Sequence, residues 1–149
     1  MGIGAISILY NLAFSPKISV IDFSNVPLAN KESAEALYKL VKISGSLEKL
    51  ILKNTNIFNF LAEDFFIALG ENKTLSLLNL DNTRGTSATV GLLGKSCGMN
   101  KKKNGNLKYL SIENVLGSYY DLSNFFNSFK ISDYSHEMWY GDKKVAKDM

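Results

Sequence analysis

Leu75-Ser76-Leu77-Leu78-Asn79-Leu80-Asp81-Asn82-Thr83 carries leucine at its first, fourth and sixth places and threonine at its ninth. Three other stretches share this spacing of apolar residues, and they begin at Ile18, Leu47 and Leu107. The four starts are 29, 28 and 32 residues apart. A recurrence near 28 residues predicts a stacked repeat fold, because one such unit cannot bury its apolar side alone.

Apolar residues also recur ten and six positions before the start of each of the first three stretches. These pairs are Ile8 and Leu12, Leu37 and Val41, and Phe65 and Leu69. Residues four apart lie on one side of a helix. Each unit is therefore expected to run strand, turn, helix, turn, with helices near 31–43, 61–69, 87–93 and 122–129. The residues before Ile18 are expected to form a helical half-repeat without a strand.

The fourth stretch departs from this rhythm. The positions ten and six before Leu107 hold Cys97 and Lys101, which make a poor apolar pair. An insertion of about four residues would restore the spacing, and Lys101-Lys102-Lys103-Asn104-Gly105 has the composition of its exposed loop. Segment 94–106 is accordingly expected to be irregular. Lys101 to Lys103 are either a solvated loop or a site that attracts phosphates or an acidic partner.

These patterns predict an α/β solenoid, a right-handed β-α superhelix, over residues 1–132. It has about four repeats plus the N-terminal half-repeat, with strands near 18–23, 47–52, 75–80 and 107–112. No further strand is expected, because residues 133–149 are mostly polar and charged, with Met138, Trp139 and Tyr140 as their one apolar run of three. That segment is expected to be a C-terminal tail or a partial cap. Two interpretations stay open: a piece of a longer array, and a compact protein with capped ends.

The stretches 47–55 and 75–83 match L-x-x-L-x-L-x-x-T, and over residues 5–130 the chain resembles leucine-rich repeat proteins. The repeat length and the helical second half of each unit are similar to the ribonuclease-inhibitor-like class. Residues 11–25 also look like the intracellular repeats of CARMIL-type regulators of actin capping. The resemblance implies parallel strands on a concave face and helices on a convex face. It says little about function.

The end of each strand carries its own pattern. The eighth place is asparagine in every unit: Asn25, Asn54, Asn82 and Asn114. Asparagine tolerates left-handed backbone, so these residues are expected in the turns, although a binding ladder is an alternative. At the ninth place, Thr55 and Thr83 can bond to turn backbone, whereas Val26 and Val115 cannot. The first and last turns are therefore expected to be looser.

Side chains at the third, fifth and seventh places should form rows across the concave face. Their mixture of apolar, aromatic and charged groups suits a protein partner, with Ile51, Leu77 and Tyr109 as the expected binding centres. The predicted protein-binding residues are Lys49, Ile51, Lys53, Leu77, Asn79, Asp81, Tyr109, Ser111 and Glu113. The rows lack the basic and aromatic stripe that nucleic acid requires, so no nucleic-acid partner is expected.

The composition supports a non-catalytic reading. Seventeen basic and fourteen acidic residues give a net charge of only +3. The single cysteine, Cys97, excludes an internal disulfide framework, and no phosphate-binding motif is present. The chain is therefore not expected to be an enzyme or to have catalytic residues, a cofactor, a metal site or a membrane span. A cytoplasmic location is expected. The predicted function is a protein-interaction module or scaffold with a cytoskeletal or regulatory partner. The alternative is a structural subunit or fragment of a larger repeat protein or complex, held by flanking repeats or a larger assembly.

Overall fold

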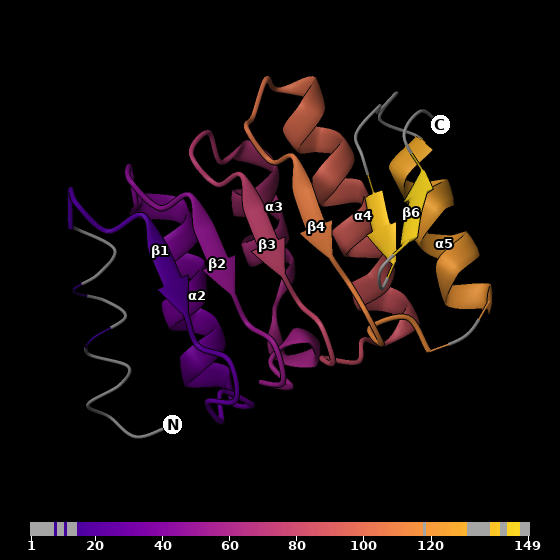
Figure 1. The fold of residues 1–149 in the computed structure, drawn as a ribbon, viewed down its shortest axis with the longest axis horizontal. Coiled ribbons are helices and arrows are strands. Elements are labelled where there is room, and N and C mark those ends of the chain that lie inside the picture. Colours follow the sequence, from indigo (N-terminus) through magenta and orange to yellow (C-terminus); the bar gives the residue numbers. More distant parts are fainter. Residues whose placement is uncertain are drawn as a thin grey trace.

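The computed structural model describes residues 8, 11, 15–117, 119–130, 138–140 and 143–146 (Figure 1). Its centre is a row of four parallel strands in chain order: β1 (Val20–Asp22), β2 (Lys49–Ile51), β3 (Leu77–Asn79) and β4 (Tyr109–Ser111). Helices α2 (Lys31–Ile43), α3 (Glu63–Glu71) and α4 (Ser87–Lys102) connect successive strands, and α5 (Tyr119–Lys130) follows β4. The helices lie side by side behind the sheet. The chain is therefore α/β, and these four strands lie within the stretches that the sequence predicts.

The strands pair in the register that the sequence pattern predicts. Val20, Lys49, Leu77 and Tyr109 are successive partners across the sheet. The hydrogen-bond ladder continues beyond the strands, because the Asn54 amide donates to the Asp81 carbonyl at 3.0 Å and the Asn82 amide to the Glu113 carbonyl at 2.7 Å. Equivalent places of neighbouring repeats therefore lie about one strand spacing apart, roughly 4.8 Å.

The core lies between the sheet and the helices. Leucine and isoleucine at the first, fourth and sixth places are buried in the second, third and fourth repeats: Leu47, Leu50, Leu52, Leu75, Leu78, Leu80, Leu107, Leu110 and Ile112. The first repeat is covered less fully, since Ile18 and Phe23 are only partly buried. The predicted helical pairs Leu37–Val41 and Phe65–Leu69 are buried against these residues. Fully burying a side chain of this size contributes roughly 2 kcal/mol.

The helices begin at residues that satisfy their first amides. Asn30 caps α2 by accepting a hydrogen bond from the Ser33 amide at 2.7 Å. Thr86 and Thr89 cap α4 reciprocally. Glu63 and Asp64 stand in the first turn of α3, where their charges complement the helix dipole. A short 3-10 helix, η1 (Phe58–Phe60), precedes α3.

The expectation that segment 94–106 is irregular is wrong for most of its length, because helix α4 runs unbroken from Ser87 to Lys102. Leu93 and Cys97 are fully buried and take the places that Phe65 and Leu69 hold one repeat earlier. Glycine is a poor helix former, yet Gly94 has a packing role here. A Cβ at this position would lie 2.5 Å from the carbonyl oxygen of Phe125, so Gly94 lets α4 approach α5 closely. The packing outweighs the low helix propensity.

The expectation that no strand follows the fourth is also wrong, because two more strands extend the sheet. Strand β5 (Met138–Tyr140) pairs in parallel with β4 through Ser111 and Trp139, and β6 (Lys143–Ala146) pairs antiparallel with β5. The described strands thus form one six-stranded sheet in chain order. A tail or partial cap at 133–149 stays a prediction.

At the other end, Ile8 is helical, as the expected half-repeat requires, but its side chain is 55% exposed and does not belong to the core. Its partner Leu12 lies outside the described residues.

Candidate functional site

The candidate site is the surface of β1 to β4 that faces away from the helices, called here the strand face. It consists of the side chains at the third, fifth and seventh places of each repeat. In the third-place row, Val20 and Tyr109 are each 51% exposed, Lys49 is exposed and Leu77 is partly exposed. Half-exposed apolar and aromatic side chains in one row offer area that a partner protein could cover.

The fifth-place row lies beside it. Asp22, Ile51, Asn79 and Ser111 are successive partners across the strands, and the last three are partly buried. Hydrogen bonds from Ser24, including its amide at 2.8 Å, hold the pKa of Asp22 below its ordinary value. Asp22 therefore presents a carboxylate on β1, opposite Ile51 of β2.

The seventh-place row gives a mixed result. Lys53 and Glu113 are exposed, as a contact surface requires. Asp81 is only 7% exposed, and its Oδ1 accepts hydrogen bonds from Ser111 Oγ at 2.7 Å and the Glu113 amide at 2.8 Å. Asp81 thus links the third repeat to the fourth, and its carboxylate is already engaged within the chain.

The eighth-place asparagines have the predicted left-handed backbone, with φ of 67° at Asn25, 59° at Asn54, 58° at Asn82 and 57° at Asn114. Their side chains also bond in pairs. Nδ2 of Asn54 donates to Oδ1 of Asn25 at 2.8 Å, and Nδ2 of Asn114 donates to Oδ1 of Asn82 at 2.8 Å. The row is therefore both a set of turn residues and a partly self-bonded ladder.

The ninth-place threonines also bond as expected. The hydroxyls of Thr55 and Thr83 each donate to the carbonyl three residues earlier, that of Leu52 and that of Leu80, at 2.6 Å. Val26 keeps only the backbone bond of its turn, to the Phe23 carbonyl at 3.0 Å.

Sequence reasoning missed a second series of polar residues, 28 positions apart, at the end of each helix. The side chains of Ser44, Asn72 and Asn100 each accept a hydrogen bond from the backbone amide at the first place of the next repeat motif. The donors are Leu47 at 3.1 Å, Leu75 at 2.6 Å and Leu107 at 3.1 Å. Both asparagines also donate to the preceding helix, Asn72 to the Val41 carbonyl and Asn100 to the Leu69 carbonyl, at 2.9 Å each. The equal spacing of Asn72 and Asn100 was the available signal.

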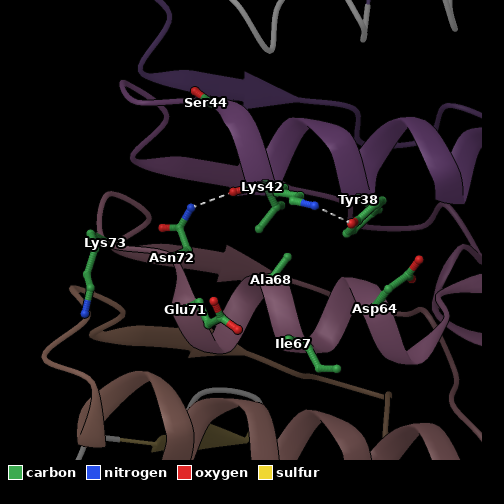
Figure 2. A pocket seen from close by; sticks show the side chains of 10 residues that line it. Tyr38, Lys42, Ser44, Asp64, Ile67, Ala68, Glu71, Asn72 and Lys73 are labelled. Carbon is green, nitrogen blue, oxygen red and sulfur yellow. Dashed lines mark hydrogen bonds between the residues drawn. The ribbon is translucent and has the colours of Figure 1, made fainter.

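The helix side carries a groove between α2 and α3 of about 530 Å³. Figure 2 shows Tyr38 and Lys42 on the α2 wall and Asp64, Ile67 and Glu71 on the α3 wall. The Tyr38 hydroxyl accepts a hydrogen bond from Lys42 Nζ at 3.0 Å and raises the pKa of Lys42. The charged residues of this groove are all exposed, so it offers no desolvated group for chemistry.

The other reactive groups give no catalytic constellation. Cys97 is fully buried, and burial raises the pKa of its thiol to about 12. No group of three His, Cys, Asp or Glu residues in the described part of the chain could hold a metal ion. The only histidine, His136, lies outside that part. None of the described helices combines the length and the apolar character needed to cross a bilayer.

Comparison with known proteins places the fold. No family model matches the chain, and no curated protein matches its sequence. Among solved structures, it is similar to leiomodin-1 actin-binding site 2, with a TM-score of 0.61 and 15% sequence identity over 89% of this chain and 90% of that one. This likeness supports a leucine-rich-repeat-like fold and does not distinguish the ribonuclease-inhibitor-like class. That solved structure is an actin-binding site of leiomodin-1.

Proposed function

We propose that this chain is a non-catalytic protein-interaction module that binds a cytoskeletal or regulatory partner on its strand face. The observation that carries the proposal is the third-place row, in which Val20, Lys49, Leu77 and Tyr109 stand in register and remain accessible. A contiguous apolar and aromatic row with a cationic side chain suits a protein surface. Ile51, Lys53, Asn79, Ser111 and Glu113 extend the same surface, while Asp81 supports it from beneath.

The finer description of the fold belongs to this proposal. We infer a leucine-rich-repeat solenoid of the ribonuclease-inhibitor-like class, with the strand face concave, in a cytoplasmic protein. The repeat length near 28 residues and the helix in each unit support the class. Helices are wider than strands, so stacking such units curves the array toward its strands.

Monomeric actin is the first partner to test, because the similar solved structure is an actin-binding site. The binding constant should be measured for the wild type and for Tyr109→Ala. Loss of a central aromatic contact should weaken binding by roughly tenfold or more. Tyr120→Ala is the matched control, because Tyr120 lies on α5 and is 70% exposed. Equal effects of the two variants would contradict the assignment of the strand face. Absence of actin binding would exclude actin as the partner, and the strand face would then be tested with other proteins.

A structural subunit of a larger assembly is the second candidate. It is favoured by the outer edge of β1, which pairs on one side only among the described strands. Light scattering combined with circular dichroism separates the two candidates. A monomer with one sharp thermal transition supports the interaction module, whereas association with a broad transition supports the subunit.

A further inference from the structure

The third repeat carries an insertion that stacking does not require. Asn72 stands three positions before Leu75, the first residue of the strand motif that follows it. Asn100 stands seven positions before Leu107, the first residue of the next strand motif. Both asparagines nevertheless make the same bond to that leucine's amide. The four extra residues are therefore Lys101 to Asn104, between the helix end and the strand.

The insertion forms a compact projection. Lys101 and Lys102 continue α4 by half a turn, and the Lys103 amide closes it on the Met99 carbonyl at 2.9 Å. Asn104 then adopts left-handed backbone, and the Gly105 amide returns to the Asn100 carbonyl at 2.6 Å. A Cβ at Gly105 would meet the Asn100 side chain, so the chain can turn back this tightly only with glycine. Figure 1 shows the end of α4 reaching beyond the corresponding ends of α2 and α3.

The projection gathers positive charge. The four residues 101–104 are exposed, and three of them are lysines. Lys73 reaches across from the preceding repeat and donates to the Lys103 carbonyl, and Lys108 is exposed where the next strand begins. One ion pair joins Lys103 Nζ of this cluster to the Glu71 carboxylate at 3.9 Å, between side chains that are each about half exposed.

Helix stability does not account for so many lysines. A cation near a helix C-terminus favours the helix dipole, but the effect falls off within the last turn. Helix α2 has one basic residue in its last turn and α3 has none. Helix α4 has two, followed at once by Lys103. The excess charge is therefore available to a partner.

The basic cluster reaches the start of β4, because Lys108 is exposed and immediately precedes Tyr109 of the strand face. We propose that Lys101, Lys102 and Lys103, with Lys73 and Lys108 beside them, dock an acidic segment of the protein that the strand face binds. This inference rests on the proposed function. The insertion has no apolar side chain to enter a membrane and no aromatic side chain to stack on a base, so an acidic protein segment fits it better than a lipid surface or nucleic acid.

A labelled poly-glutamate peptide is a direct probe of this site. Its dissociation constant should be measured by fluorescence anisotropy at increasing salt, for the wild type and for the triple variant Lys101→Gln, Lys102→Gln, Lys103→Gln. Loss of three exposed ion pairs should weaken binding about tenfold and flatten the salt dependence. The matched control is Lys31→Gln, Lys39→Gln, Lys95→Gln, which removes the same charge elsewhere.

A second variant deletes residues 101–104. It should keep a cooperative thermal transition, because Asn100 then stands three positions before the strand motif, as Asn72 does, and it should bind the peptide as weakly as the triple variant. The glutamine variants keep the chain length and decide the question if the deletion does not fold. Equal weakening in the control would overturn the proposal. So would tighter binding to phosphatidylserine vesicles or to a single-stranded oligonucleotide than to poly-glutamate.

Tyr109→Ala separates this proposal from the proposed function. It should leave the binding of poly-glutamate unchanged while weakening the binding of the folded partner protein. Loss of partner binding in Tyr109→Ala alone would support the strand face and reject the basic cluster. Loss in the triple variant alone would do the reverse.

Discussion

The side-chain amide of Asn100 donates a hydrogen bond to the backbone carbonyl of Asn72 at 3.0 Å. These two residues hold the same place in successive repeats, and Asn72 makes its own bond to the Val41 carbonyl of the repeat before. Asn100 is fully buried, so its amide has no access to water. A chain of such bonds ties the end of each helix to the next and sets the start of the following strand.

We expect Asn100→Ala to destabilise the protein by about 2–4 kcal/mol, because it leaves the Leu69 and Asn72 carbonyls and the Leu107 amide without this partner. Urea unfolding followed by circular dichroism measures the change. Asn127→Ala, at an exposed position of α5, is the control and should change the free energy of unfolding by less than about 0.5 kcal/mol. A similar effect of both variants would mean that the Asn100 bonds contribute nothing specific.

Leu77 and Leu78 are adjacent leucines on opposite faces of β3, so the same substitution at each compares the strand face with the core. Leu78 is fully buried, and Leu78→Ala should cost about 2–5 kcal/mol. Leu78→Asp should unfold the chain, because it places a charge in the core. Leu77→Asp, on the strand face, should leave a cooperative thermal transition. A folded Leu78→Asp variant with native circular dichroism would refute the repeat register.

Ser33 Oγ is buried and lacks a hydrogen-bond partner in the described structure. We expect Ser33→Ala to be neutral or to stabilise the protein by up to about 1 kcal/mol, since it removes a polar group that is buried without compensation. Ser96 gives the contrast, because its hydroxyl donates to the Phe66 carbonyl at 2.7 Å in the core. Ser96→Ala should therefore cost about 1–3 kcal/mol. Thermal denaturation of both variants tests the difference in sign.

The buried thiol predicts a loss of stability at alkaline pH. Burial raises the pKa of Cys97 from 9.0 to about 12, so between these values the unfolded chain releases the thiol proton and the folded chain keeps it. The folded state then binds more protons, and the free energy of unfolding falls as pH rises through this window. Cys97→Ala should lack this part of the fall, which urea titrations at several pH values would measure.

Reactivity offers a second readout of the same thiol. Alkylation of Cys97 by iodoacetamide at neutral pH should proceed only as fast as the chain opens, because the thiolate is the nucleophile and the thiol is covered. Rapid alkylation of the folded protein, matching that in urea, would contradict the burial.

The sequence predicted the repeats better than it predicted their edges. Leu50, Leu78 and Leu110 lie opposite one another as expected, since a fixed spacing with a buried side allows only one register. The insertion was placed correctly, but α4 was expected to end near Leu93. The close approach to α5 at Gly94, which favours a continuous helix, depends on a neighbour that local propensity does not describe.

The site was predictable only as a set of rows. Asp81 occupies a seventh place like Lys53, yet it is turned inward by bonds from Ser111 and Glu113 of the next repeat. Such bonds join residues about 30 positions apart, and a pattern read within one repeat does not contain them. Strand β5 was missed because Met138 to Tyr140 lacks the apolar spacing and pairs with β4 only at Ser111 and Trp139.

The insertion after Asn100 also removes an ambiguity that equivalent units create. Four strands in constant register present similar backbones at equal intervals, so an elongated partner could settle one repeat too early or too late with little change in its main contacts. Among the described repeats, only the third carries a projection. A partner that touches both Tyr109 and the neighbouring lysines therefore has a single alignment along the sheet and a single polarity.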